Sequence, residues 1–296
     1  MEPILARARE GGGGILTVDV TKLAKLLLIP AGALLCLSTA LAFQKQFRVY
    51  PSLEPYDVVP LPADYQERTE WVFARLMFPS SRYARFERWG RDWREGGTSW
   101  TEDYPRADRH FNLALRRLTR VQVRSVEQPV NLDDGDDVFN WPWLYAGLPG
   151  NWNLTDAQAA KLRDFLERGG FFLADDFWGP EEWDRFQEGL ERVFPGRAII
   201  DLEDGEKIFH SVYDLSGRYQ IPGEWARNRG VPYRDGGITP YWRGVFDDRQ
   251  RIMVAICANS DLGDAWEWAD APHYPEKYSA LGIRMGVNYV IYAMTH

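Results

Sequence analysis

Hydrophobic and polar positions alternate along residues 66–296 in blocks that predict strands and helices in turn. Residues 103–119 predict a helix, because apolar residues recur there at near-helical spacing: Ala107, Phe111, Leu113, Leu115 and Leu118. Apolar runs predict strands before and after this helix, at 71–78, 120–126 and 137–148.

The unit that follows has the clearest boundaries. Thr155 and Gln158 form a capping box before a helix, and Gly169 stands where that helix ends. Residues 171–174 then predict a buried strand, and Pro180 stands at the first position of another helix.

The C-terminal third predicts a strand at 197–202, an antiparallel hairpin at 244–259 and a closing helix at 275–295. Strands that alternate with helices predict parallel pairing through right-handed crossovers. The fold expected is therefore a doubly wound, mostly parallel α/β sheet with an antiparallel edge hairpin.

The N-terminal region differs in composition from the rest of the chain, because residues 26–43 form an apolar run without a charged residue. The Ala40-Leu41-Ala42 triplet favours a cleaved signal peptide, whereas the length of the run favours a membrane anchor. Both readings predict a cell-envelope protein, with its domain outside the cytoplasmic membrane. We expect three parts: 1–43 as signal or anchor, 44–65 as a proline-rich linker, and 66–296 as the domain.

The net charge of the chain bears on its partners, and its cysteine content bears on disulfide formation. The chain has a net charge of -8, and removing residues 1–42 takes away four basic and three acidic residues, which leaves -9. Nucleic acid is therefore not an expected partner. Cys257 is the one cysteine after Ala42, so no intramolecular disulfide is expected, and its apolar strand predicts a packing role.

Ligands of parallel sheets bind at the carboxyl ends of the strands. The expected strand ends lie at 79–82, 145–148, 175–178 and 259–264, and they would share one rim. Their polar and aromatic residues are the candidate ligand-binding set: Arg82, Asp175, Asp176, Trp178, Asn259, Asp261 and Asp264.

Asp175 and Asp176 would point to opposite faces of an extended strand, so they cannot form a close carboxylate pair. We expect one to face the rim and the other to support the helix near Gly179; the alternative is that both only cap turns. The segment after Cys257 predicts a long loop that folds over the rim and brings Asn259, Asp261 or Asp264 near this pair. It would form an acidic, aromatic-walled pocket for a cation or a polyhydroxylated ligand; the alternative is a lid that only covers the sheet edge.

The acidic run, the histidines, the tryptophans and three arginines give weaker indications of a site. The run Asp133–Asp137 lacks the spacing of a calcium loop, and the four histidines lack metal-ligand spacing, so we expect no metal site and no cofactor. The 13 tryptophans fit either a sugar-binding platform or core packing. Arg75, Arg82 and Arg85 would meet an anionic ligand or nearby carboxylates.

Four segments, "WTEDYPRADRHF", "LRDFLERGGFFLADDFWG", "NSDLGDAWEW" and "MGVNYVIYAMT", resemble the bacterial family of domains of unknown function 4159. The resemblance covers about residue 71 to the C-terminus. It implies a flavodoxin-like fold similar to class I glutamine amidotransferases and ThuA-like proteins. It also implies envelope partners of a MoxR-type ATPase and von Willebrand A system.

Amidotransferase chemistry is not expected, because the strand end "LADDFW" lacks the cysteine and flanking glycines of a nucleophile elbow. The first expectation is therefore a non-catalytic binding or scaffold domain. The alternative is a hydrolase of envelope glycan or another carbohydrate, with a rim aspartate as base and Arg82 or His210 assisting.

Overall fold

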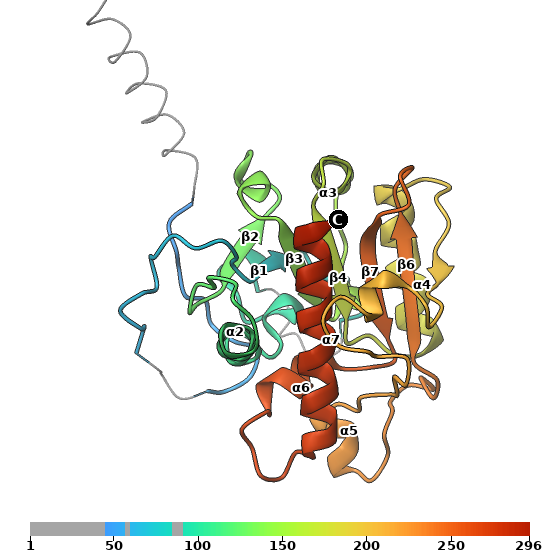
Figure 1. The fold of residues 1–296 in the computed structure, drawn as a ribbon. Coiled ribbons are helices and arrows are strands. Elements are labelled where there is room, and N and C mark those ends of the chain that lie inside the picture. The colour runs from blue at the N-terminus through green and yellow to red at the C-terminus, as the bar shows by residue number, and fades with distance from the viewer. Residues whose placement is uncertain (1–44, 57–59, 85–90) are drawn as a thin grey trace, which may run out of the picture. The chain divides into compact units, whose positions relative to one another are not determined.

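The computed structural model describes residues 45–56, 60–84 and 91–296. Residues 45–296 form one compact unit around a seven-stranded sheet of order β2-β1-β3-β4-β7-β6-β5 (Figure 1). Its strands are β1 Ala74–Met77, β2 Gln128–Asn131, β3 Trp143–Gly147, β4 Phe171–Asp175, β5 Ile200–Asp201, β6 Tyr241–Phe246 and β7 Ile252–Ala258. Pairing is parallel from β2 to β7 and antiparallel at β6 and β5, which confirms a mostly parallel α/β sheet with an antiparallel edge.

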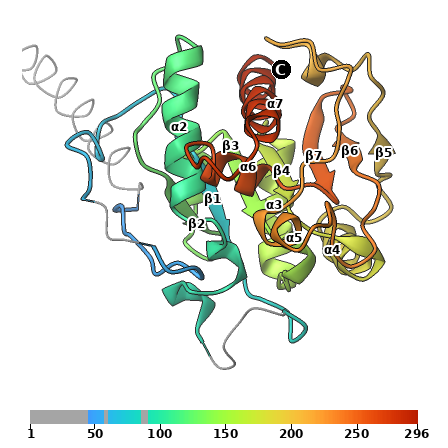
Figure 2. The ribbon, with the colours of Figure 1, turned by 90° about the horizontal axis from the view of Figure 1, so that it is seen from below.

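Helices cover both faces of the sheet (Figure 2). Helices α2 (Arg106–Leu118) and α7 (Glu276–Thr295) lie on one face, over a core that includes Phe73, Tyr145 and Leu173. Helices α3 (Asp156–Glu167) and α4 (Gly179–Val193) lie on the other, over a core that includes Leu144 and Phe172. Alternate residues of the central strands β3 and β4 thus supply the two cores, as a sheet buried on both faces requires.

Short helices complete the connections. The 3-10 turns are η1 Trp93–Glu95, η2 Ser99–Thr101, η3 Asp137–Asn140, η4 Pro149–Asn151 and η5 Lys207–Phe209, and the two short α-helices are α5 Glu224–Asn228 and α6 Leu262–Glu267. The predicted capping box is confirmed, since Gln158 N donates to Thr155 Oγ1 at 3.2 Å and Thr155 N donates to Gln158 Oε1 at 3.0 Å.

One strand prediction was wrong, and another was confirmed only in part. The second strand is β2, because the predicted run 120–126 bends where Arg124 turns inward and donates to the carbonyls of Val126 and Glu127. Pro129 fits β2 because this strand lies at the sheet edge. The run 197–202 contributes only the two-residue antiparallel edge strand β5, so β7 of the hairpin takes the parallel place beside β4.

The N-terminal apolar segment, with the signal and anchor readings, lies outside the described residues. Within the part of the chain that is described, no helix has both the length and the apolar character of a membrane span. The described part of the predicted linker lies against the domain: Tyr50 is buried and its N–H donates to Tyr104 Oη at 3.2 Å, and Leu53 N donates to the Thr101 carbonyl at 3.2 Å.

Candidate functional site

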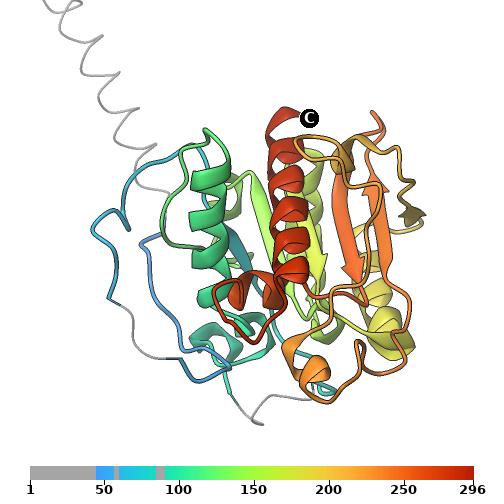
Figure 3. The ribbon, with the colours of Figure 1, turned by 60° about the horizontal axis from the view of Figure 1, so that its bottom comes forward.

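A pocket of about 430 Å³ opens at the carboxyl rim of the parallel strands. Leu148 follows β3, Asp176 follows β4 and Asp261 follows β7, and all three line it. Helices α5 and α6 lie at the same rim (Figure 3). The site therefore occupies the place where parallel sheets usually bind ligands.

The wall of this pocket is acidic and aromatic. One arginine, Arg234, stands among the described lining residues against seven carboxylates: Glu54, Glu102, Asp103, Asp176, Glu224, Asp261 and Asp264. Trp178, Trp225 and Trp268 supply aromatic surface. A concave, largely desolvated surface with one sign of charge concentrates ligands of the opposite sign.

Asp175 is fully buried and supports helix α6. Its Oδ2 accepts hydrogen bonds from the backbone N–H groups of Leu262 and Gly263, both at 2.9 Å, and from the Tyr145 hydroxyl at 3.0 Å. Burial is the main cause that raises the pKa of Asp175 well above its ordinary value, and the charge of Asp176 adds to it. Asp175 thus fixes the rim and is not part of the pocket wall.

Asp176 lines the pocket instead. Its φ of 53° turns the chain out of the strand, and its Oδ1 accepts from Trp178 Nε1 at 2.6 Å and from Arg234 Nη2 at 3.1 Å. Arg234 also lies 3.6 Å from Glu182, so this arginine is held by two carboxylates. A non-glycine residue in the left-handed region is uncommon and is often found at ligand sites.

One expectation needs correction: neither aspartate caps the helix near Gly179. Glu182 and Asn259 do so, since Trp178 N donates to Glu182 Oε2 at 2.7 Å and Gly179 N donates to Asn259 Oδ1 at 2.8 Å. Asn259 was predicted as a ligand-binding residue, but both polar atoms of its side chain bind other parts of the chain. Besides the bond that its Oδ1 accepts, its Nδ2 donates to the Thr239 carbonyl at 2.7 Å. Its side chain joins β7 to α4.

The segment after β7 is also not a long loop, because residues 262–267 form helix α6. Asp261 is its N-cap and accepts from Asp264 N at 2.7 Å. Asp264 in turn accepts from Glu224 N at 2.6 Å and from Trp268 Nε1 at 2.8 Å. The structure therefore places Asp261 and Asp264 in the wall with Asp176, on a short helix rather than a lid.

Electrostatics in the pocket favour neutralisation of its carboxylates. Burial raises the pKa of Asp103 and of Asp261 well above the ordinary value, and neighbouring carboxylates add to both shifts. The pKa of Glu102 is raised in the same way, by burial first and by the charge of Glu54 next. Such a group of acids binds either protons or a cation.

Other sequence candidates lie elsewhere. Arg82 is exposed and lines a separate groove with Arg185 and Arg192. His210 lies beside Asp214, 3.3 Å away, and its Nε2 donates to the Asp204 carbonyl at 2.7 Å. Arg75 forms a buried ion pair with no surface access, and Arg85 lies outside the described residues.

The side chains of the acidic run 133–137 form ion pairs with neighbouring segments. Asp133 pairs with Arg94 at 3.3 Å, Asp136 pairs with Lys161 at 3.1 Å, and Asp134 pairs with Lys45. Cys257 is fully buried in β7 beside the Tyr289 hydroxyl at 3.7 Å, which confirms its packing role.

Sequence reasoning missed Arg234 and four of the seven carboxylates in the wall, namely Glu54, Glu102, Asp103 and Glu224. Glu54 belongs to the proline-rich segment, Glu102 and Asp103 precede α2, and Arg234 lies between α5 and β6. These positions have no regular spacing from the strand ends, so only tertiary structure brings them together. The one local signal was the acidic pair Glu102-Asp103, which precedes helix α2.

Residues 92–294 match the family model described as domain of unknown function (DUF4159). The chain belongs to this family. Most of the pocket wall lies inside the matched DUF4159 region, and only Leu53, Glu54 and Pro55 precede it. A search of curated proteins found no match.

Proposed function

We propose that this DUF4159 domain is a non-catalytic binding domain that recognises a ligand with a positively charged group. The observation that carries the proposal is the composition of the pocket wall, which contains seven carboxylates, three tryptophans and one arginine. That arginine, Arg234, already forms ion pairs with Asp176 and Glu182. Carboxylates pair with an organic ammonium or guanidinium group, and tryptophan faces attract the same cations.

The fold proposed is flavodoxin-like and similar to class I glutamine amidotransferases. Its support is the strand order β2-β1-β3-β4, followed by β7 as the fifth parallel strand, which matches the flavodoxin-like order 2-1-3-4-5. In such sheets the ligand binds beside the carboxyl ends of the central strands, where the acidic pocket lies.

A binding role without catalysis is supported by the composition of the wall. The described residues that line the pocket include no serine, threonine, cysteine or histidine. Cys257 is fully buried, and burial raises the pKa of its thiol well above the ordinary value. The hydrolase alternative gains no specific support, because Arg82 and His210, its proposed assistants, contact other parts of the domain.

An envelope location is part of the proposal and rests on the charge-free apolar segment 26–43. Partners of the MoxR-type ATPase and von Willebrand A class follow from the family resemblance alone. Fractionation of cells that express the tagged full chain tests the location: the proposal expects membrane or extracytoplasmic fractions, and a cytosolic chain contradicts it.

The test of ligand class is calorimetric titration of the full chain with small cations and neutral sugars. The panel contains choline, lysine amide, arginine amide and spermidine, with cellotetraose and a chitin tetramer as neutral polyhydroxylated ligands. The proposal expects binding of at least one cation, weakened at least tenfold by Asp261→Asn and unchanged by Asp184→Asn, whose exposed side chain lies on α4. Binding of the sugars alone would contradict it.

A further inference from the structure

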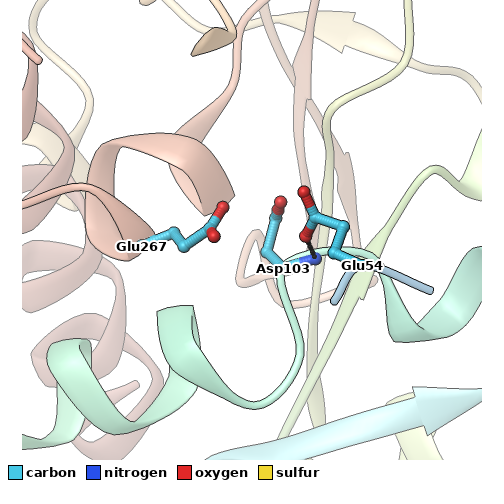
Figure 4. Close-up of side chains that lie close together, drawn as sticks. All are labelled: Glu54, Asp103 and Glu267. Carbon is cyan, nitrogen blue, oxygen red and sulfur yellow. Dashed lines mark hydrogen bonds between the residues drawn. The ribbon is translucent and has the colours of Figure 1, made fainter. Parts of the chain in front are cut away.

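Three carboxyl groups converge from segments that are far apart in the chain (Figure 4). Glu54 comes from the described segment 45–56 of the predicted linker, which we call the arm, Asp103 from the turn before α2, and Glu267 from the end of α6. One carboxylate oxygen from each residue lies within 4.8 Å of those from the other two. We call these residues the carboxylate triad.

Two members of the carboxylate triad present buried oxygens with no partner. Asp103 is 3% exposed and Glu267 is 0% exposed. Asp103 Oδ2 and Glu267 Oε2 have no hydrogen-bond partner among the described residues. An unpaired buried carboxylate is costly, so each of these oxygens points to a group that would neutralise it.

The described residues supply no basic side chain for this purpose. The nearby arginines are engaged: Arg75 pairs with Asp108, and Arg234 pairs with Asp176 and Glu182. The groups that reach the triad are neutral donors, namely the Tyr56 hydroxyl, which donates to Glu267 Oε1 at 2.6 Å and also contacts Glu54, and Asp103 N, which donates to Glu54 Oε2 at 3.0 Å. Neutral donors do not compensate the charge of these three residues when they are ionised, so protons or a cation must do so.

We propose that Glu54, Asp103 and Glu267 bind a hard divalent cation, and that Ca²⁺ fits them better than Mg²⁺. Two oxygen ligands of one Ca²⁺ ion, at about 2.4 Å each, lie no more than about 4.8 Å apart, and the three carboxylate oxygens meet this condition pairwise. Ca²⁺ accepts an irregular set of carboxylate ligands, whereas Mg²⁺ requires near-octahedral geometry and retains several waters.

This site does not depend on the organic cation proposed above. Glu54 and Asp103 line the pocket, but Asp176, Asp261, Asp264 and Glu102 remain outside the carboxylate triad and still exceed the charge of Arg234. The ion would join the arm at Glu54 to helix α6 at Glu267, so it would also stabilise the docked arm. Metal binding is therefore testable with the metal alone.

The experiment is calorimetric titration of the EDTA-treated full chain with Ca²⁺ and, separately, with Mg²⁺. Tb³⁺, which replaces Ca²⁺, provides a second readout, because tryptophans in the pocket wall such as Trp268 would sensitise its luminescence. We expect one Ca²⁺ per chain, bound more tightly than Mg²⁺, with affinity at least tenfold lower in Glu267→Gln and Asp103→Asn and unchanged in Glu203→Gln, which is exposed.

Glu54 is only partly buried, so Glu54→Gln is a second variant that should fold even if a core variant does not. Its affinity for Ca²⁺ should also be at least tenfold lower. Absence of Ca²⁺ and Mg²⁺ binding at millimolar concentrations by the folded chain would overturn the site. Binding unchanged by Glu54→Gln and Glu267→Gln would do the same. Tighter binding of Mg²⁺ than of Ca²⁺ would overturn the choice of ion.

Discussion

Arg75 on β1 and Asp108 on α2 form an ion pair 2.5 Å long in which neither side chain is exposed. Arg75 Nη1 also donates to the carbonyls of Trp100 at 3.2 Å and Glu102 at 2.9 Å. This arginine therefore joins the central sheet, helix α2 and the turn that carries Asp103. The same ion pair therefore stabilises the core and holds in place the turn whose Glu102 and Asp103 line the pocket.

Breaking this pair should strongly destabilise the domain. Asp108→Ala leaves a buried guanidinium without its carboxylate, and such a change costs about 3–5 kcal/mol. The control is Asp164→Ala, since the exposed Asp164–Arg168 pair on α3 is worth no more than about 0.5 kcal/mol. Urea denaturation of the full chain measures both, and equal effects of the two variants would contradict the prediction.

The same carboxylate predicts an unusual pH dependence. Burial raises the pKa of Asp108 to about 6, despite the opposing charge of Arg75. The folded state then binds more protons than the unfolded chain, whose aspartate pKa is about 3.9, so this contribution to stability is present at low pH and is lost as pH rises through about 6. The free energy of unfolding should fall by about 1 kcal/mol between pH 5 and pH 7 from Asp108 alone. A rise over this interval would contradict it.

Asp175 should act through its acceptor oxygen rather than its charge. Asp175→Ala removes the partner of Leu262 N, Gly263 N and the Tyr145 hydroxyl, and a cost of about 2–4 kcal/mol is expected because these buried donors lose their bonds. Asp175→Asn retains an acceptor and should cost about 1 kcal/mol or less. Thermal unfolding measures the loss of stability in both variants. Equal losses in Asp175→Ala and Asp175→Asn would contradict the prediction and show that the charge of Asp175 matters.

Gly263 has no room for a side chain. A Cβ at this position would lie 2.1 Å from Asp103 Oδ2 and 2.9 Å from the Tyr145 hydroxyl. Gly263→Ala should therefore displace the Asp103 carboxylate, cost about 1–3 kcal/mol and weaken Ca²⁺ binding. Gly217→Ala is the matched control, because a Cβ there would meet no atom within 4 Å. Calorimetry that shows the same Ca²⁺ affinity for both variants would contradict this prediction.

Much of the fold followed from local patterns, because capping residues and apolar periodicity act over a few residues. The Thr155–Gln158 capping box, helix α4 and the β6–β7 hairpin were predicted in this way. The strand β2 was missed because its sequence, QPVN, carries a proline and little apolar character. Only its place at the edge of the sheet makes that composition acceptable.

The candidate site was predictable only along the strand ends. Asp176 follows β4 directly and Asp261 lies three residues after the end of β7, so parallel pairing places them at one rim. Glu54 and Arg234 come from irregular segments, and no periodicity relates them to the strands. The expectation that one of Asp175 and Asp176 supports α4 was wrong. Asp175 supports α6, and α6 lies within a segment that was predicted as a loop.

The central claim is that the pocket selects positive charge, and an isosteric ligand pair tests it most directly. Calorimetry should compare the tightest cation of the panel with its neutral counterpart, in which carbon or hydroxyl replaces the charged nitrogen; for choline this is 3,3-dimethylbutan-1-ol. The account predicts that the cation binds at least tenfold more tightly, and that Asp176→Asn and Asp261→Asn reduce this ratio. Equal affinity for the charged and neutral ligands would contradict it.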